Sequence, residues 1–259
     1  MEKTVSKDGT GIAYRQVGDG VPVVLVSPAT CTHEADLPLA GELAAGGCAA
    51  YVYDRRGRGE SGDTAPYAVA REVEDLAAVI EAAGGAAGVY GISSGGALAL
   101  EAAASGLPIV RVAVYEVPWA RDPTVLAGAS AYTVELGERL AAGDRGGAVE
   151  LFLRRVGLPT EAIAGMRQAP FWAGLVALAP TLAHDDAVMG GGEVPAGRLA
   201  RIAQPLWAGC GGASAEWFRD TGRAIAAAAQ RGRYETLEGQ DHRVDTAVLA
   251  PVLARFFTG

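Results

Sequence analysis

VYGISSGGALALEAA, residues 89–103, joins a predicted strand to a predicted helix through the pattern G-x-S-x-G. Gly91 and Gly95 flank Ser93, and small residues at these two positions let a strand and a helix close together at a sharp turn. A residue at such a turn has strained backbone angles and exposes its side chain above the sheet. The stretch therefore predicts an α/β fold with a reactive hydroxyl at Ser93.

The frame of the pattern selects Ser93 rather than Ser94, because a nucleophile at Ser94 would need glycine where Ile92 stands. The N-terminus of the following helix and the amide of Ser94 would then face any oxyanion formed at the turn. The alternative interpretation is a glycine–serine loop that only caps a helix.

Short apolar runs alternate with Ala-rich helical stretches on both sides of this turn, as in a mostly parallel sheet. The first two runs are separated by Lys7-Asp8-Gly9, which favours an antiparallel hairpin. We predict a doubly wound α/β sheet. The predicted strands are residues 2–6, 11–16, 21–27, 49–54, 87–91, 110–116, 204–210 and 234–238, and the predicted helices are residues 35–46, 68–83, 94–105, 214–229 and 246–257.

The alternation stops between residues 119 and 202, where helical segments are separated by Gly and Pro. We predict a helical cap at 119–202, inserted into a core of residues 1–118 and 203–259. Aromatic side chains of a cap belong first to its own core and second to a substrate pocket. On the second interpretation, the predicted substrate-binding residues are Trp119, Phe171, Trp172 and His184.

Composition narrows the class of protein. The chain has 259 residues, half of them apolar, and a net charge of −8, which argues against nucleic-acid binding. The N-terminus is polar, and no apolar run is long enough to cross a bilayer. Cys31, Cys48 and Cys210 lack metal-ligand spacing and suit free thiols in a reducing compartment. We expect a cytoplasmic monomer or homodimer with a small-molecule substrate and no membrane partner, disulfide, metal or cofactor.

With these motifs in place, the chain resembles the α/β-hydrolase superfamily over nearly its whole length, as a small serine hydrolase with a helical cap. The turn at Ser93 resembles the superfamily's nucleophile elbow. YDRRGRGES at residues 53–61 resembles its D-x-R-G-x-G-x-S loop, slightly shifted, and Gly239-x-x-His242 resembles its base motif. The resemblance implies an eight-stranded, mostly parallel α/β-hydrolase fold with an inserted helical cap.

A serine hydroxyl needs a neighbouring base near neutral pH, and the chain has three histidines. His242 follows the last predicted strand, and loops at the C-terminal edge of such a sheet converge on its crevice. His242 also completes the order serine, acid, histidine. We predict His242 as the base, with His184 facing the cavity or packing in the cap. His33 is interpreted as a surface or turn residue, with pocket lining as the alternative.

The resemblance implies an aspartate after the strand that reads PLWAGC, but Gly212 stands at that position. Some superfamily members place the acid after the strand that follows the nucleophile helix, where this chain has Glu116. A carboxylate at that edge can reach the distal ring nitrogen of His242 and fix its tautomer. We therefore predict Glu116 as the acid.

Other assignments of the acid stay open: Glu216, Asp220, a cap residue such as Asp185, or no acid at all. Asp241 is disfavoured because adjacent side chains on an extended segment point apart. Glu116 has the alternative role of pairing with one of the arginines of residues 55–58.

The resemblance places a second oxyanion donor just after strand 21–27, where family members commonly have His-Gly. This chain has Ser27-Pro28-Ala29 there, so the donor carried over is the amide of Ala29, because Pro28 has no N–H. The predicted oxyanion hole is therefore formed by Ala29 and Ser94.

The glycines of residues 57–62 also satisfy the dinucleotide pattern G-x-G-x-x-G. The context disagrees, because no helix begins at the third glycine and this is not the first strand–helix turn. We interpret this segment as a glycine loop that Asp54 and the arginines buttress beside the active site.

The leading hypothesis is a serine hydrolase that cleaves an ester, lactone or thioester of a small, moderately apolar substrate through an acyl-enzyme on Ser93. A second hypothesis uses His242 as the base of a cofactor-independent lyase, isomerase or cyclase. A third is a non-catalytic small-molecule-binding protein, because a fold alone does not guarantee activity.

Overall fold

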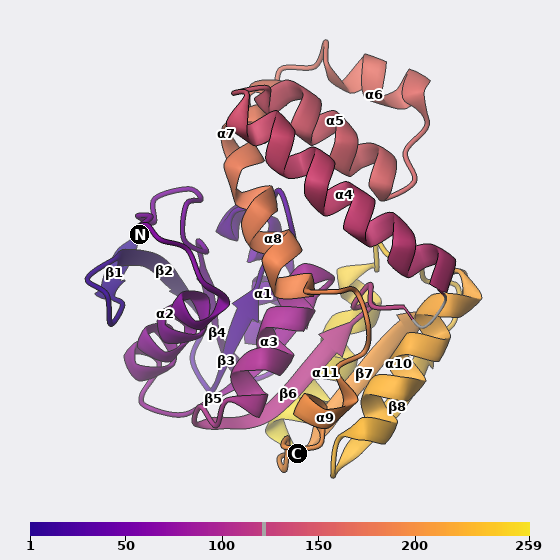
Figure 1. Ribbon diagram of the computed structural model, residues 1–259. Coiled ribbons are helices and arrows are strands. Elements are labelled where there is room, and N and C mark those ends of the chain that lie inside the picture. The colour runs from indigo at the N-terminus through magenta and orange to yellow at the C-terminus, as the bar shows by residue number, and fades with distance from the viewer. Residues whose placement is uncertain (121–122) are drawn as a thin grey trace.

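The computed structural model describes residues 1–120 and 123–259 of the chain, and its centre is an eight-stranded sheet in the order β1-β2-β4-β3-β5-β6-β7-β8 (Figure 1). β1 and β2 pair antiparallel, as do β2 and β4, and the other neighbours are parallel. The predicted mostly parallel α/β sheet is confirmed. Its strands are β1 (Glu2–Val5), β2 (Gly11–Val17), β3 (Val21–Val26), β4 (Cys48–Tyr53), β5 (Ala87–Ile92), β6 (Ile109–Tyr115), β7 (Leu206–Gly211) and β8 (Gly232–Leu237).

Helices cover both faces of this sheet and bury two apolar clusters. On one face lie α2 (Val69–Ala82), α3 (Ser94–Ala104) and α10 (Glu216–Ala228), which contribute Leu76, Leu98 and Ile225 to one cluster. On the other face lie α1 (Leu37–Ala45) and α11 (Thr246–Thr258), which contribute Leu43 and Leu253 to the other. β4 is buried at every position because it is covered on both faces, which explains why its sequence is almost wholly apolar.

Further helices lie between β6 and β7 and form the inserted region (Figure 1). A third cluster, which includes Leu136, Val149 and Leu182, gives this region an apolar core of its own. Val188 and Leu199, near the end of the inserted region, pack instead into the main core beside α3. The division of the chain at 119 and 202 stays a prediction. The helices are α4 (Pro123–Ala141), α5 (Arg145–Arg155), α6 (Thr160–Met166), α7 (Trp172–Leu178), α8 (Leu182–Met189) and α9 (Ala196–Leu199).

Within the parts of the chain that the structure describes, no helix combines the length and the apolar character that crossing a bilayer requires.

Candidate active site

The turn between β5 and α3 has the geometry that the glycine-flanked pattern predicts. Ser93 has φ 55° and ψ −127°, a left-handed conformation that L-residues rarely adopt. A side chain on Gly95 would collide with the carbonyl oxygen of Val26, and one on Gly91 would collide with the backbone of Gly95. Glycine is therefore needed at both positions for the strand and the helix to approach each other, and Ser93 stands half-buried between them.

The end of β6 lies beside this turn, because the Ser93 amide donates a hydrogen bond of 3.0 Å to the carbonyl of Tyr115. Glu116 is the next residue, and its amide donates to the carbonyl of Gly209 on β7 at 3.1 Å. Glu116 also has a positive φ, of 45°. The two residues that follow neighbouring parallel strands are thus both held in strained backbone conformations at the same edge of the sheet.

Glu116 and His242 are joined by a hydrogen bond of 2.9 Å between Oε2 and the ring Nδ1. The other carboxylate oxygen accepts from the Gly211 amide at 2.8 Å and from the Cys210 thiol at 3.3 Å. Burial alone would raise the pKa of Glu116, but the hydrogen bonds from His242 and Gly211 outweigh it and hold that pKa below its ordinary value. Glu116 is therefore a buried, ionised carboxylate that fixes one nitrogen of an imidazole.

His242 lies in the loop after β8, with 45% of its side chain exposed. Tyr115 donates to the carbonyl of the preceding residue, Asp241, at 2.9 Å, which ties this loop to β6. The ring of Phe218 stacks on the imidazole with centroids 5.4 Å apart, and Trp217 stacks on Phe218 at 3.7 Å. The residues predicted from the sequence do not include Trp217 and Phe218. The feature that could have indicated them is an aromatic pair at the start of the helix after β7, on the edge where the loops converge.

The other candidate acids have other partners. Glu216 pairs with Arg219, and Asp220 pairs with Arg223 at 3.0 Å, both on the exposed start of α10. Asp185 is buried and bonds to Ser94 and to buried arginines. Among the candidates, Glu116 is the one with a hydrogen bond to His242. Its role as the catalytic acid stays a prediction.

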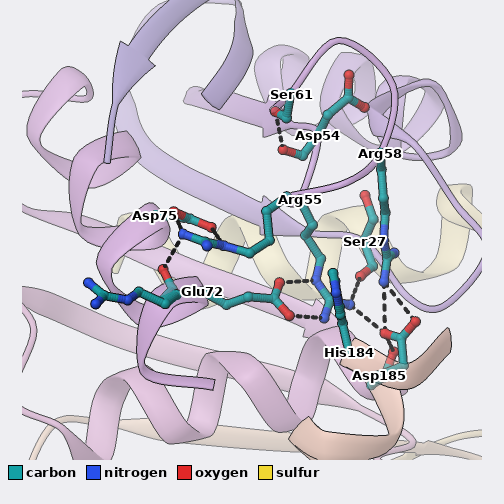
Figure 2. Close-up of polar contacts among 12 residues, drawn as sticks. Ser27, Asp54, Arg55, Arg58, Ser61, Glu72, Asp75, His184 and Asp185 are labelled. Carbon is teal, nitrogen blue, oxygen red and sulfur yellow. Dashed lines mark hydrogen bonds and ion pairs between the residues drawn. The ribbon is translucent and has the colours of Figure 1, made fainter. Parts of the chain in front are cut away.

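The arginines at positions 55, 56 and 58 pair with carboxylates other than Glu116 (Figure 2). Arg55 forms two hydrogen bonds with Glu72, of 2.7 and 2.8 Å, and a third of 2.7 Å with Asp185. Arg58 donates to both carboxylate oxygens of Asp185 at 2.8 and 2.7 Å. All four side chains are buried, so a balanced set of two positive and two negative charges lies beneath the loops of the site.

Asp54 organises the glycine loop, as the sequence suggests. Its carboxylate accepts from the His33 amide at 2.8 Å, the His33 ring at 2.9 Å and the Glu60 amide at 2.9 Å. Ser61 donates to the Asp54 carbonyl at 2.6 Å (Figure 2). α2 begins at Val69, well after the last glycine of the loop, so the loop lacks the helix start that holds a dinucleotide pyrophosphate.

The loop after β3 carries the predicted second oxyanion donor, Ala29, which packs partly buried against the core of the inserted region. Arg58 donates to the Pro28 carbonyl at 2.6 Å, and Arg55 donates to the Ser27 carbonyl at 3.3 Å. The loop is therefore held from below by the buried arginines.

The predicted substrate-binding residues lie in different surroundings. Trp119 is buried in the main core and donates from its indole to the Met189 carbonyl at 3.1 Å, whereas Trp172 packs partly buried in the inserted region. Phe171 is 55% exposed. His184 is buried and stacks on Tyr67 with ring centroids 3.9 Å apart, and burial holds the pKa of its imidazole below its usual value. Contact of these four residues with a substrate stays a prediction.

Within residues 1–120 and 123–259, no group of three or more His, Cys, Asp or Glu side chains is arranged to hold a metal ion.

Three solved structures show what the whole chain resembles. An alpha/beta hydrolase from Sphaerobacter thermophilus DSM 20745 is 48% identical with a TM-score of 0.90, and the match covers 99% of this chain and 100% of that one. An enol-lactonase from Burkholderia xenovorans LB400 is 19% identical with a TM-score of 0.72, covering both chains completely. A thermophilic esterase from Thermogutta terrifontis is 20% identical with a TM-score of 0.73, covering 99% of each chain.

At these identities the last two structures show the fold alone. No curated protein sequence matches the chain significantly. The model of the alpha/beta hydrolase family matches residues 23–252, which is most of the chain. Together with the eight-stranded sheet and the turn at Ser93, this match shows that the protein belongs to the alpha/beta hydrolase family and supports a hydrolase-type activity.

Proposed function

We propose that this protein is a serine hydrolase that cleaves an ester, lactone or thioester of a small, moderately apolar substrate through an acyl-enzyme on Ser93. The observation that carries the proposal is the 2.9 Å hydrogen bond between buried Glu116 and His242. That pair lies at the strand edge where the backbone of Ser93 is bonded to the end of β6. A serine at an elbow and an imidazole oriented by a carboxylate are the components that acyl transfer requires.

In the first half of the reaction, Ser93 Oγ attacks the carbonyl carbon of the substrate while the free Nε2 of His242 takes the hydroxyl proton. The oxyanion that forms accepts hydrogen bonds from the amides of Ala29 and Ser94. Glu116 stabilises the imidazolium at Nδ1. The intermediate then collapses, the bond to the leaving oxygen or sulfur breaks, and His242 returns the proton to that atom.

In the second half, His242 takes a proton from water, and the resulting hydroxide attacks the acyl-enzyme carbonyl. Breaking of the acyl–oxygen bond releases the acid, and the proton returns to Ser93. Each step moves one proton between named atoms, so the residues of this chain and water complete the cycle.

The choice of ester and lactone substrates has support from the relatives. Solved structures of similar fold include an enol-lactonase and esterases, and a lactone is an ester closed on itself. Both substrates present the same carbonyl to the same nucleophile and differ in whether the leaving alcohol stays attached. A panel of p-nitrophenyl esters, thioesters and small lactones is therefore the first screen.

The proposal is tested with a fluorophosphonate probe and intact-mass measurement. We expect labelling of the wild-type protein at a single site, and loss of both labelling and ester turnover in Ser93→Ala. The control is Ser105→Ala at the other end of α3, where the side chain is exposed, and this variant should label and turn over like the wild type.

Two outcomes would overturn the proposal in favour of its rivals. Turnover that survives Ser93→Ala would indicate chemistry with His242 as a base and no acyl-enzyme, as in a lyase, isomerase or cyclase. Binding of acyl compounds with neither labelling nor turnover would indicate a non-catalytic binding protein.

A further inference from the structure

Arg58 is a buried side chain that divides its donors between two parts of the proposed site. One terminal nitrogen, Nη1, donates to the Pro28 carbonyl at 2.6 Å and to the Cys31 carbonyl at 3.3 Å. The other, Nη2, donates to both oxygens of Asp185 at 2.8 and 2.7 Å (Figure 2). The planar guanidinium holds these two directions at a fixed angle. The position of Asp185 therefore fixes where Nη1 meets the carbonyl oxygens of the loop after β3.

The Pro28 carbonyl and the Ala29 amide belong to one peptide group. A trans peptide is planar, and its C=O and N–H point in opposite directions. When Arg58 holds the carbonyl oxygen on its own side, the Ala29 N–H is turned to the other side of the loop. A rotation of this peptide would move the donor away without moving any side chain of the site.

Asp185 also contacts the other proposed donor. Its Oδ1 accepts a hydrogen bond of 2.8 Å from the hydroxyl of Ser94, the first residue of α3. Ser94 is buried, and its amide follows the nucleophile directly. One carboxylate therefore holds Ser94 on one side and, through Arg58, the Pro28–Ala29 peptide on the other.

We infer that the buried Arg58–Asp185 pair is a positioning pair that orients both amide donors of the oxyanion hole. The inference rests on the proposed function. Asp185 belongs to α8, in the inserted region between β6 and β7, whereas Ser93, Glu116 and His242 do not. The inserted region thus completes the oxyanion hole as well as adding helices to the fold.

The charge state of the pair supports this role. Burial would raise the pKa of Asp185, but Arg58 and Arg55 outweigh burial and hold that pKa below its ordinary value. A charged acceptor makes shorter and stronger hydrogen bonds than a neutral one, which suits a group that must hold two neighbours in place.

The test compares two charge-balanced double variants. Arg58→Met/Asp185→Asn removes the positioning pair and one charge of each sign. Arg56→Met/Asp75→Asn is the matched control, because Arg56 is equally buried in the same loop and forms two hydrogen bonds of 2.7 Å with Asp75. The control pair contacts neither the loop after β3 nor Ser94 through any hydrogen bond that the described residues show.

Turnover of a p-nitrophenyl ester is measured per active site, with sites counted by fluorophosphonate labelling. We expect kcat of the positioning variant to fall by roughly 10- to 100-fold with KM unchanged, since displaced oxyanion donors act on the transition state. Inhibition by a trifluoromethyl ketone, which forms an oxyanion on Ser93, should weaken by the same factor. The pH profile should keep its shape, because the Glu116–His242 pair is untouched.

The control variant should lose stability but keep its kcat per active site. If the positioning variant matches the control in kcat and in inhibitor affinity while Ser93 still labels, the inference fails and the proposed function stands. If Ser93→Ala keeps its turnover, the proposed function fails and the inference fails with it.

Should the double variant not fold, Arg58→Lys carries the test. It keeps the buried charges balanced but lacks the planar fork that joins Asp185 to the Pro28 carbonyl, so kcat and inhibitor affinity should fall together by a smaller factor. Wild-type values of both constants in this variant would also overturn the inference.

Discussion

Ser93 and Glu116 illustrate how single residues at this site are held under strain. Their φ angles of 55° and 45° lie in a region that costs a non-glycine residue on the order of 1–3 kcal/mol. Each follows directly on a central strand, and the amide of Ser93 is bonded to the carbonyl that precedes Glu116. The hydrogen bonds and packing of the sheet therefore have to offset this cost to keep both side chains at its edge.

Glu116→Gln tests the acid directly. The amide is the same size as the carboxylate, but it does not stabilise the imidazolium, so kcat should fall by roughly 10²- to 10⁴-fold. Steady-state ester hydrolysis checks this prediction. Glu216→Gln is the control, since Glu216 is bonded to Arg219 rather than to His242. A large loss in the control together with a normal rate in Glu116→Gln would move the acid role to α10.

Asp36 is a second informative residue, because its carboxylate is buried and accepts a hydrogen bond from Ser27. Burial raises the pKa of Asp36 from 3.8 to about 6, although the Ser27 hydroxyl opposes the shift. The Asp36 carboxyl therefore keeps its proton up to a higher pH in the folded state than in the unfolded chain. The resulting penalty on folding is absent below about pH 4 and grows to roughly 3 kcal/mol above pH 6.

Asp36→Asn should remove this penalty. Relative to the wild type, its free energy of unfolding should rise by about 3 kcal/mol between about pH 4 and pH 7. Urea denaturation at the two pH values measures the difference. Exposed Asp19→Asn is the control and should show no such trend. A gap between Asp36→Asn and the wild type that does not change with pH would contradict the assignment.

At the scale of elements, the turn between β5 and α3 depends on close contact of backbones. Gly95→Ala would push a methyl group into the Val26 carbonyl of β3, so the strand and the helix must separate. We expect destabilisation by about 3 kcal/mol, the upper end for overpacking, together with loss of fluorophosphonate labelling. Thermal and urea unfolding report the first effect, and mass measurement reports the second.

Gly137→Ala is the matched substitution in an unconstrained helix. Gly137 lies exposed within α4, and no atom stands near the position of an added Cβ. Alanine there should stabilise the protein by about 0.5–1 kcal/mol, because it restricts the unfolded chain. Equal effects of the two alanine variants on unfolding would show that the turn at Ser93 is not sterically constrained.

The start of α1 differs from the prediction made from local sequence rules. Residues 35–46 are predicted as one helix, but the structure has a 3₁₀ turn at His33–Asp36 before α1 begins at Leu37. Asp36 is a good capping residue by type, yet its side chain bonds to Ser27 on the loop after β3. Because of this tertiary contact, the Asp36 side chain does not cap the N-terminus of α1.

At the scale of the whole molecule, the buried charges join the inserted region to the sheet. Arg55 contacts Glu72 of α2 and Asp185 of α8, and Arg58 contacts Asp185. Breaking a buried pair by removing one partner leaves a charge uncompensated and costs about 3–5 kcal/mol. The inserted helices and the core should therefore unfold together as a single unit.

Acid should weaken this connection. Burial favours protonation of Glu72 and Asp185, but the arginines outweigh it and lower the pKa of both carboxyl groups. Their stabilisation is complete above the unfolded values near pH 4 and is lost as the pH falls through the lower folded values. The free energy of unfolding should decrease below about pH 4.

Urea denaturation between neutral pH and about pH 3 measures the effect of acid. The charge-balanced variant Arg58→Met/Asp185→Asn lacks one of the two carboxylates and should show a shallower decrease than the wild type. An equal slope in the two proteins would show that Asp185 does not link stability to pH.

The sequence by itself determined the fold class, the elbow at Ser93 and the candidacy of His242 and Glu116. The fold class and the elbow depend on local chemistry: glycines where backbones must meet and apolar runs with strand spacing. The effect of the glycines and of the apolar runs is confined to a few neighbouring residues, so the order of amino acids reveals it. The candidacy of Glu116 and His242 rested on polar residues directly after strands, together with the resemblance to the superfamily.

Only the tertiary structure decided which carboxylate bonds to His242, which residues hold the loop after β3, and that Phe218 stacks on the imidazole. Glu116 and His242 are separated by 126 positions, and Arg58 and Asp185 by 127. Hydrogen bonds and ion pairs act over a few ångströms in space and do not depend on distance along the chain. Choosing among several acids of equal chemistry therefore required the folded arrangement of the strands and of α8.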